Sequence, residues 1–381
     1  MSSQDFLRRM PEASHALRKP VGIWQRLHID LPLLVMLLVL TAYGLVVLYS
    51  ASGENGHYIK RQSVFFVIAY FAMFITAQIK MQVLQRWAPW FYGGGVLLLV
   101  LVIFFGTGAK GAQRWLSVGG FRFQPSEVLK LAVPIAVAAY LARRLLPPGL
   151  KHVFVVLVLI GVPTVLIMRQ PDLGTSLLIA ASGLIVLFFA GLRWRYIGGA
   201  FAAVLMAAWP MWQFVLRDYQ KQRILTLLSP EADKLGAGWN IIQSKTAIGS
   251  GGVDGKGWLQ GTQSQLDFLP ESHTDFIIAV LAEEFGLTGV LMLLALYILV
   301  IGRGLIIGLR AQDTFSRLLA GGITLTFFVY VFVNIGMVTG LLPVVGVPLP
   351  LVSHGGTSIV TLMTGFGMLM AISTERRRLT I

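Results

Sequence analysis

Ten stretches of apolar residues, each long enough to form a helix that crosses a membrane, follow one another along the chain. About 20 helical residues are needed to cross roughly 30 Å of hydrocarbon. The stretches run approximately over residues 31–50, 63–79, 88–106, 125–142, 152–168, 173–191, 196–216, 275–302, 318–340 and 354–373. This pattern predicts an all-α polytopic integral membrane protein with about ten transmembrane helices.

The composition supports a membrane-embedded chain and excludes several kinds of chemistry. Hydrophobic residues make up 56% of the 381 residues and charged residues only 13%, about half the charged fraction of a soluble protein. There is no cysteine, so disulfides, thiolate catalysis and cysteine-based metal sites are excluded. Residues 1–29 are polar and basic and lack an apolar core, which indicates a cytoplasmic tail and not a signal peptide.

The basic residues are distributed unequally between the two sides of the membrane that these helices define. The segments assigned to the cytoplasm are the N-terminal end, 80–87, 143–151, 192–195, 303–317 and the C-terminal end. They hold 18 of the 31 Lys and Arg residues and five acids, a balance of +13, whereas the rest of the chain has a balance of +1. Because cytoplasmic loops are enriched in Lys and Arg, both termini are predicted to be cytoplasmic.

This topology places the long polar segment 217–274, between the seventh and eighth helices, on the extracytoplasmic side. The predicted organisation is a tail over 1–29, a membrane domain over 30–373 and a second tail over 374–381. The net charge of +14 follows from the topology, so no nucleic-acid partner is needed to explain it. Short polar segments rich in glycine and proline lie at the extracytoplasmic ends of the predicted helices, which indicates a polar cleft there. ATP and nucleotide-sugars are cytoplasmic, so we expect a different substrate.

The main catalytic candidate is Asp275, at the start of the eighth apolar stretch. An ionisable residue in a membrane segment is costly and marks function by default. Asp275, Ala279 and Glu283 follow one another at intervals of four residues, so one helical face would carry both carboxylates toward the protein interior. The alternative is that Asp275 lies in a first helical turn and interacts with the helix dipole.

Two further acidic positions allow both a structural and a functional interpretation. Glu127 and Lys130 lie three residues apart on the fourth stretch and either neutralise each other or contact substrate. Asp172 either caps the sixth helix or belongs to the polar cleft. The glycine-rich run 249–257 fails the phosphate-loop pattern, because Ser250 and Gly257 stand where that pattern needs a glycine and a Ser or Thr; we expect a flexible loop that contacts a partner or a lipid headgroup.

Several motifs together resemble those of the SEDS family (shape, elongation, division and sporulation). They are Arg114-Trp115, Gln124-Pro125-Ser126-Glu127 with Lys130, Gln170 to Thr175, Ala247 to Gly257, Gly261 to Ser264, Phe268 to Glu271, Thr274-Asp275-Phe276, Glu283-Glu284, Gly346 to Pro350 and Gly355-Gly356. The chain departs from the family at His354, where tyrosine is usual, and at Thr357, where serine is common. We expect altered packing at these two positions without loss of activity.

The resemblance implies a peptidoglycan glycosyltransferase that polymerises lipid II at the outer face of the bacterial cytoplasmic (inner) membrane. It also implies a class B penicillin-binding transpeptidase as partner, and the short C-terminal tail and the form of residues 346–350 favour the cell-elongation machinery over division. Asp275 matches the family's catalytic aspartate. Inversion by single displacement needs only one base.

The leaving group of that reaction, undecaprenyl pyrophosphate, needs positive charge beside it. The candidate cations are Arg114, Arg122, Lys130 and Lys245, with Glu127 and Asp172 orienting them or holding a divalent ion. The six histidines form no metal motif, so any metal would be Mg²⁺ or Mn²⁺ on carboxylates, and no organic cofactor is expected.

Two other functions remain open on the sequence. A lipid II flippase would fit the polytopic shape, the interrupted helices and a Glu–Lys pair. It is less favoured because no inverted repeat relates the two halves and the polar motifs lie at one face. A non-catalytic scaffold for a transpeptidase would fit the loops but leaves Asp275 unexplained.

Overall fold

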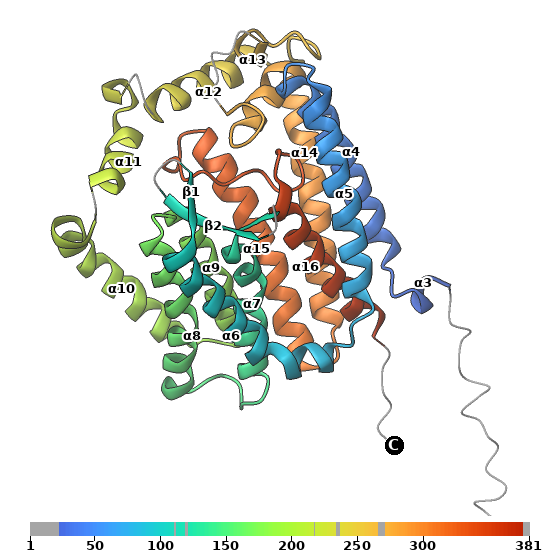
Figure 1. Cartoon of the computed structure of the whole chain (residues 1–381), viewed down its shortest axis with the longest axis vertical. Coiled ribbons are helices and arrows are strands. Elements are labelled where there is room, and N and C mark those ends of the chain that lie inside the picture. The colour runs from blue at the N-terminus through green and yellow to red at the C-terminus, as the bar shows by residue number, and fades with distance from the viewer. Residues whose placement is uncertain are drawn as a thin grey trace, which may run out of the picture.

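The protein is a bundle of long helices, with a small sheet and a group of shorter helices at one end (Figure 1). The computed structural model describes residues 23–109, 112–118, 121–216, 218–233, 237–265 and 271–375. The long helices are α4 (Leu31–Ala51), α5 (Gly56–Ala77), α6 (Met81–Phe105), α7 (Pro125–Leu141), α8 (Leu150–Arg169), α9 (Leu173–Phe189), α10 (Trp194–Pro210), α14 (Ile277–Arg310), α15 (Thr314–Val338) and α16 (Gly356–Thr374).

Each of the ten predicted apolar stretches overlaps one of these helices, although α5 and α6 begin seven residues earlier than predicted and α14 ends eight residues later; the all-α polytopic fold class is confirmed. Eight helices of the described chain are long and apolar enough to cross a membrane, where α10 is counted together with the helical turn that continues it to Phe214. The other two are α7 and α9, which have 17 residues each; α9 is a shorter apolar helix and α7 carries Glu127 and Lys130. The number of crossings and the sidedness of the loops stay predictions.

The two ends of the described chain meet at one end of the bundle. Asp30 caps α4, accepts hydrogen bonds from Arg303 of α14 at 2.6 and 3.0 Å, and also accepts one from Ser373 of α16. Burial alone would raise the pKa of Asp30, but the hydrogen bonds from Arg303 and Ser373 hold it below its ordinary value. His28 lies 3.1 Å from the Thr374 hydroxyl. Helices α4, α14 and α16 are therefore joined at this end of the bundle.

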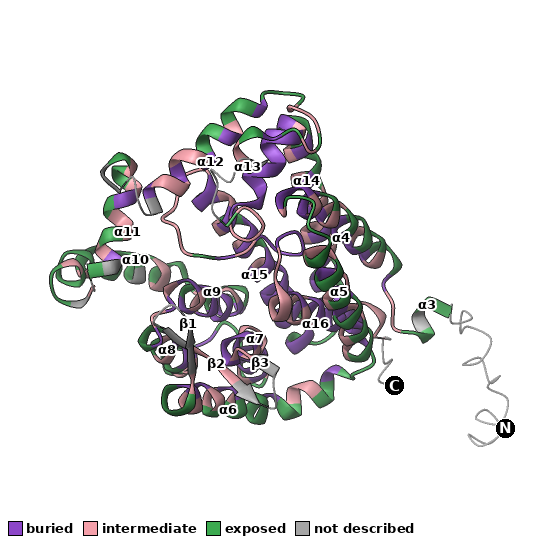
Figure 2. Ribbon diagram, turned by 45° about the horizontal axis from the view of Figure 1, so that its top comes forward, coloured by how far each residue is buried: buried purple, intermediate pink, exposed green. Residues whose placement is uncertain are grey.

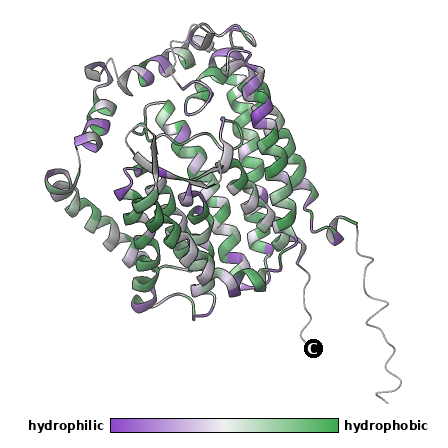
Figure 3. Cartoon of the chain, viewed as in Figure 1, coloured by the Kyte–Doolittle hydropathy of each residue, from purple (hydrophilic) through white to green (hydrophobic). Residues whose placement is uncertain are grey.

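Helix α7 lies at the centre of the bundle, whereas α10 lies at its edge (Figure 2). Most residues of α7 are buried, and none of the described side chains of α10 is. Hydrophobic residues predominate along the long helices (Figure 3), and many of their large apolar side chains are exposed, as expected of surfaces that face lipid. Small residues allow close packing, as at Gly367 of α16, where a Cβ would collide with the backbone of Met73 in α5.

A small antiparallel sheet, which the sequence did not predict, follows α6. Its strands β1 (Thr107–Ala109), β2 (Ala112–Val118) and β3 (Phe121–Phe123) lie in the order β1-β2-β3. Thr107 pairs with Trp115 and Leu116 with Phe123. The sheet carries Arg114 and leads directly into α7, so it belongs to the frame of the candidate site.

The polar segment between α10 and α14 is largely helical and folds back onto α14. It contains η1 (Met211–Val215), α11 (Asp218–Leu228), η2 (Pro230–Asp233), α12 (Ala237–Gly251) and α13 (Thr262–Gln265), and α3 (Ile23–Arg26) precedes α4. Ser244 of α12 donates to the carbonyl of Val338 in α15 at 2.9 Å. Of the predicted loop 217–274, residues 217, 234–236 and 266–270 lie outside the described residues.

The glycine-rich run is not the flexible loop we expected, because it pairs with a break in α14. Gly286 has φ 64° and ψ −161°, which interrupts the helix. The amides of Lys256 and Gly257 donate to the carbonyls of Glu283 and Glu284, both at 3.0 Å. In return, the amides of Leu287 and Thr288 donate to the carbonyls of Gly252 and Val253 at 3.0 and 3.2 Å. The run therefore satisfies the backbone groups that the break would leave unpaired.

Candidate functional site

One group of charged side chains begins with an ion pair on α7. Gln124 occupies the N-cap position without a side-chain capping hydrogen bond, and Pro125 occupies the first helical position, where a proline costs no hydrogen bond. One turn further, Lys130 Nζ lies 2.6 Å from Glu127 Oε1, and the two side chains are 12% and 7% exposed. The Lys130 ammonium also lies 5.2 Å from the centre of the Tyr330 ring on α15. The mutual neutralisation considered from the sequence is therefore present, and it is buried.

A second pair joins the sheet to the turn between α8 and α9. Asp172 caps α9 by accepting from the amide of Thr175 at 3.3 Å, and it also accepts from the Thr175 hydroxyl at 3.0 Å. Arg114 on β2 approaches the same carboxylate at 3.7 Å and donates to the carbonyls of Gln170 and Pro171. Asp172 thus serves as a helix cap and as a partner for a cation.

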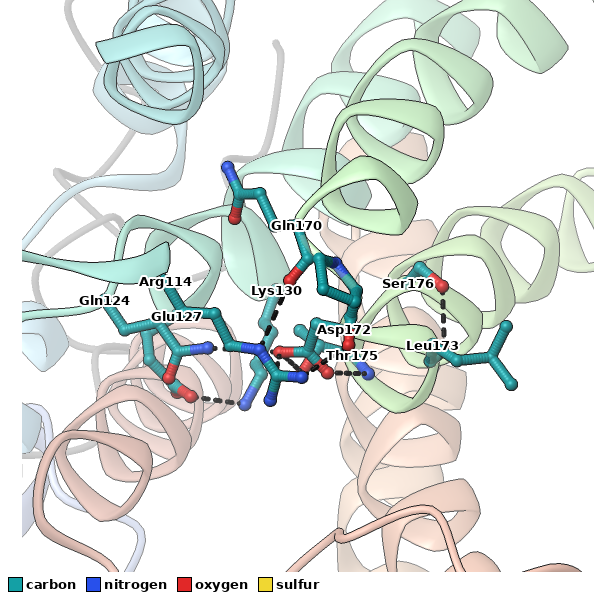
Figure 4. A network of polar contacts seen from close by, with 10 residues as sticks. Arg114, Gln124, Glu127, Lys130, Gln170, Asp172, Leu173, Thr175 and Ser176 are labelled. Atoms are coloured by element: carbon teal, nitrogen blue, oxygen red, sulfur yellow. Dashed lines mark hydrogen bonds and ion pairs between the residues drawn. The ribbon is translucent and has the colours of Figure 1, made fainter. Parts of the chain in front are cut away.

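Gln124 links the two pairs, because its Nε2 donates to Asp172 Oδ2 at 3.3 Å. Figure 4 shows the resulting network, in which side chains from β2, α7 and the α8–α9 turn point toward one another. We call Arg114, Glu127, Lys130 and Asp172 the four-charge network. Its two carboxylates and two cations balance, which lowers the cost of burying them together.

Asp275 does not belong to the helix that follows it. It lies in the turn 271–276, and α14 begins at Ile277, so the helical stripe predicted through Asp275 starts only after it. Ala279 and Glu283 are fully buried, as that stripe predicted. The Asp275 side chain is partly exposed, and a Cβ added at Gly346 would lie 3.4 Å from its Oδ2. The carboxylate therefore faces the segment between α15 and α16.

Asn334 of α15 fixes the backbone on both sides of this contact. Its Nδ2 donates to the carbonyl of Asp275 at 2.9 Å and to that of Val347 at 2.7 Å. Val347 packs with Leu178 and Tyr330 in a small buried cluster. Since Tyr330 also contacts Lys130, a continuous chain of contacts runs from the Asp275 turn to the four-charge network.

The segment between α15 and α16 lines a small cavity beside this chain of contacts. The cavity has about 20 Å³ and is lined by Lys130, Tyr330, Ser353 and residues 348–351, among others. That volume is roughly what a single water molecule needs. Through this cavity, therefore, only a group about the size of a water molecule can reach Lys130.

The two glutamates of α14 have partners of their own. Glu283 Oε1 lies 2.7 Å from Lys256 Nζ and accepts from the Thr262 hydroxyl and the Gln263 amide. Glu284 accepts from Ser50 of α4. These contacts join α14 to the glycine-rich run and to the first long helix, which is a structural role.

Three histidines and a tyrosine gather beside the Asp275 turn. Tyr58 lies 4.9 Å from the ring of His273 and 5.3 Å from that of His354, and the His354 amide donates to the His273 carbonyl at 2.9 Å. Burial lowers the pKa of His354, and the charges of Arg61, His273 and His57 lower it further. His354 thus packs edge-on against the Tyr58 ring, and the altered packing expected at His354 and Thr357 stays a prediction.

The remaining predicted residues lie outside the four-charge network. Lys245 is exposed on α12, and its Nζ lies beside Gly340 at the end of α15. Arg122 lies in β3, where its backbone pairs with Ser117, and its side chain is outside the described residues.

The described residues do not fit the metal site that the sequence left open. Within them, no three His, Asp or Glu side chains gather in a way that would hold a metal ion. Glu127 and Asp172 face Lys130 and Arg114 instead.

Two residues that the sequence interpretation missed prove central. Tyr330 and Asn334 lie one turn apart on α15 and connect Lys130 with the Asp275 turn. The signal was present, because both are polar positions in the apolar stretch 318–340 and their spacing of four residues puts them on one helical face.

These observations define a polytopic membrane protein with a balanced network of two carboxylates and two cations and a partly exposed aspartate beside it. The chain belongs to the cell cycle protein family of FtsW, RodA and SpoVE, whose family model matches residues 31–378. This is the SEDS family that the sequence motifs resemble.

Similar proteins with curated names are glycosyltransferases. Peptidoglycan glycosyltransferase MrdB of Escherichia coli K12 is 56% identical over 359 residues, which cover 94% of this chain and 96% of that protein. The probable peptidoglycan glycosyltransferase FtsW of Trichlorobacter lovleyi is 38% identical over 373 residues, which cover 94% of this chain and 95% of that protein.

Two solved structures share the fold. A chain from a peptidoglycan synthase complex, whose structure concerns the coordination of polymerization and crosslinking, matches with a TM-score of 0.80 at 31% identity over 90% of this chain and 97% of its own. The rod shape determining protein RodA of Thermus thermophilus matches with a TM-score of 0.69 at 28% identity over 92% of this chain and 98% of its own.

Proposed function

We propose that Asp275 is the general base of a lipid II polymerase that acts during cell elongation. The chain is a peptidoglycan glycosyltransferase and a multi-pass protein of the bacterial cytoplasmic membrane, as its 56% identity to MrdB over nearly the whole chain and its eight apolar helices support. The observation that carries the role of Asp275 is its position: a partly exposed carboxylate on a turn whose backbone is held by buried Asn334.

The proposed reaction is a single displacement. The 4-hydroxyl of the acceptor GlcNAc attacks the anomeric carbon of the donor MurNAc, a new glycosidic C–O bond forms, and the bond to undecaprenyl pyrophosphate breaks. Asp275 takes the proton of the attacking hydroxyl, and the pyrophosphate leaves with the bonding electron pair. The anomeric configuration inverts, so no second carboxylate is needed as a nucleophile.

The cations divide into two proposed roles. Arg114 is one-third exposed and held by two carbonyls, so it is preorganised to stabilise developing negative charge on the pyrophosphate. Lys130 is buried against Glu127 and is proposed to act with it in fixing α7 against α15 beside the substrate. Arg122 and exposed Lys245 remain candidates for contacts with the lipid-linked phosphates.

We propose a class B penicillin-binding transpeptidase as partner. The support is the similarity to a chain from a synthase complex that couples polymerization to crosslinking. The substrate and the partner would then meet at the end of the bundle that carries α11, α12 and α13, opposite the joined termini (Figure 1).

The test is polymerisation of labelled lipid II by the purified protein with its cognate transpeptidase. Asp275→Asn keeps the shape and removes the base, so glycan strand formation should fall by about 10²–10⁴-fold. Asp254→Asn, an exposed aspartate in the glycine-rich run, is the matched control and should retain activity. Both variants are checked for partner binding and melting temperature.

Equal polymerisation by wild type and Asp275→Asn would remove Asp275 from the mechanism. If no intact complex forms polymer and the protein translocates lipid II in proteoliposomes, the proposed polymerase function is wrong and the flippase function is correct.

A further inference from the structure

A cavity that the proposed reaction does not use lies between α6, α7 and α8. It has about 280 Å³ and lies near the lower size limit of small-molecule sites. Its lining comes from the first turns of α6, the last turns of α7 and the middle of α8: Gln85, Ala88, Pro89, Tyr92, Ala136, Ala139, Tyr140, Arg143, Arg144 and Leu159.

The cavity is amphipathic along its length. Arg143, Arg144 and Gln85 lie at the helix ends, whereas Ala136 and Leu159 lie deeper in the bundle. From Ala136 to the end of α7 at Leu141 the helix rises by about 8 Å, and Arg143 follows two residues later. The apolar part exists because Ala88, Ala136 and Ala139 present only methyl groups where the helices face one another.

The polar mouth carries positive charge without acidic neighbours. Arg143 and Arg144 are exposed, and neither has a carboxylate partner among the described residues. No Asp or Glu occurs in the sequence between Glu54 and Glu127 or between Glu127 and Asp172, and these segments supply the whole lining. None of the lining residues would therefore repel an anion at this mouth.

The rim is held in place by contacts that do not involve a ligand. The Tyr140 hydroxyl lies 2.9 Å from His152 Nδ1, and the Arg144 guanidinium lies 5.5 Å from the centre of the Tyr140 ring. Deeper in the cavity, the Tyr92 hydroxyl donates to the Leu159 carbonyl at 2.9 Å. The mouth is thus partly preorganised.

The mouth lies at the same end of the bundle as the described chain ends, and two exposed tryptophans lie beside it. The turn between α5 and α6 contacts the start of the chain, because Gln78 donates to the Leu27 carbonyl at 2.7 Å. Trp87 and Trp90 of α6 are 61% and 76% exposed next to the cavity. Exposed tryptophans of membrane proteins concentrate at the membrane–water interface.

We propose that this cavity binds one anionic phospholipid. The lipid belongs to the leaflet on the side of the membrane where the two described chain ends lie, which the charge asymmetry predicts to be the cytoplasmic side. Arg143 and Arg144 contact the phosphate, and the first part of one acyl chain lies among Ala88, Ala136 and Ala139. The proposal is independent of the catalytic role of Asp275.

The test is native mass spectrometry of the delipidated full-length protein, titrated with phosphatidylglycerol or with phosphatidylcholine of the same acyl chains. We expect tighter binding of phosphatidylglycerol. Arg143→Gln/Arg144→Gln should weaken that binding by about 30-fold, roughly fivefold for each basic residue at an anionic surface. The matched control is Arg193→Gln/Arg195→Gln, an exposed pair before and in α10 at the same end of the bundle, which should have little effect.

A second variant tests the apolar half. Ala139→Leu fills the apolar part of the cavity, so it should weaken the binding of long-chain phosphatidylglycerol. The binding of a short-chain form, which the mouth alone can hold, should not change. Melting temperatures confirm that each variant is folded. Equal affinity for the two lipids, equal losses from both arginine pairs, or unchanged long-chain binding by Ala139→Leu would each overturn the proposal.

Discussion

At the scale of single residues, Asn334 holds the turn that carries Asp275. Its amide is fully buried and bonds to two carbonyls, one of them that of Asp275. Asn334→Leu leaves both carbonyls without this donor, so we expect a loss of about 2–4 kcal/mol in stability. Polymerisation should fall further than stability predicts, because the turn that carries Asp275 is released. Thermal melting and lipid II polymerisation measure the two effects; unchanged activity in a folded variant would contradict the positioning role.

The pair of Glu127 and Lys130 allows its structural and functional roles to be separated. Lys130→Met or Glu127→Gln alone leaves a buried charge without its partner and should cost about 3–5 kcal/mol. The double variant removes both charges and should recover most of that stability. If the pair only positions α7, activity returns with stability in the double variant. If Lys130 binds the pyrophosphate, stability returns and polymerisation does not.

His354 predicts a dependence of stability on pH. Its pKa is lowered in the folded protein, so as pH falls below about 6.5 the unfolded chain takes up a proton first. Stability should therefore be lost between pH 6.5 and the lower folded pKa, and it should be unaffected by this residue above pH 7. His354→Tyr should melt with less dependence on pH over that window, with His57, His273 and Arg61 still present. If wild type and His354→Tyr lose stability equally in acid, the loss is due to other titrating groups and not to His354.

At the scale of elements, the break in α14 is the feature with the strictest sequence requirement. Gly286 has a positive φ, and a Cβ there would collide with the backbone of Gly255 and Val253. Gly286→Ala should therefore cost about 3 kcal/mol or more. Gly302→Ala is the matched control on the same helix, since nothing lies within 4 Å of its added Cβ, and it should be neutral or stabilising by up to about 1 kcal/mol. Melting temperatures of the two variants in the same detergent make the comparison.

At the scale of the whole molecule, the positions of the long helices could be predicted from the sequence, because apolar length alone identifies a membrane helix. The ion pair on α7 and the cap at Asp172 followed equally from local spacing. The sheet at 107–123 could not be predicted, since its strands are short and their pairing depends on the neighbouring helix ends. The contacts between Lys256 and Glu283 or Asn334 and Asp275 join positions far apart in the chain, which local patterns do not specify.

The non-helical residue Gly286 also affects how this protein enters the membrane. Residues 287–310 form about 36 Å of helix, enough by themselves to span a bilayer, and they contain no acidic residue. The preceding residues 277–285, which carry Glu283 and Glu284, need not be inserted into lipid with them. During biogenesis the α14–α15 hairpin can therefore integrate as an ordinary apolar pair, before the carboxylates find Lys256 and Ser50. Membrane insertion and assembly of the site are thus separate events, and a variant that lacks Lys256 should still be inserted with native topology.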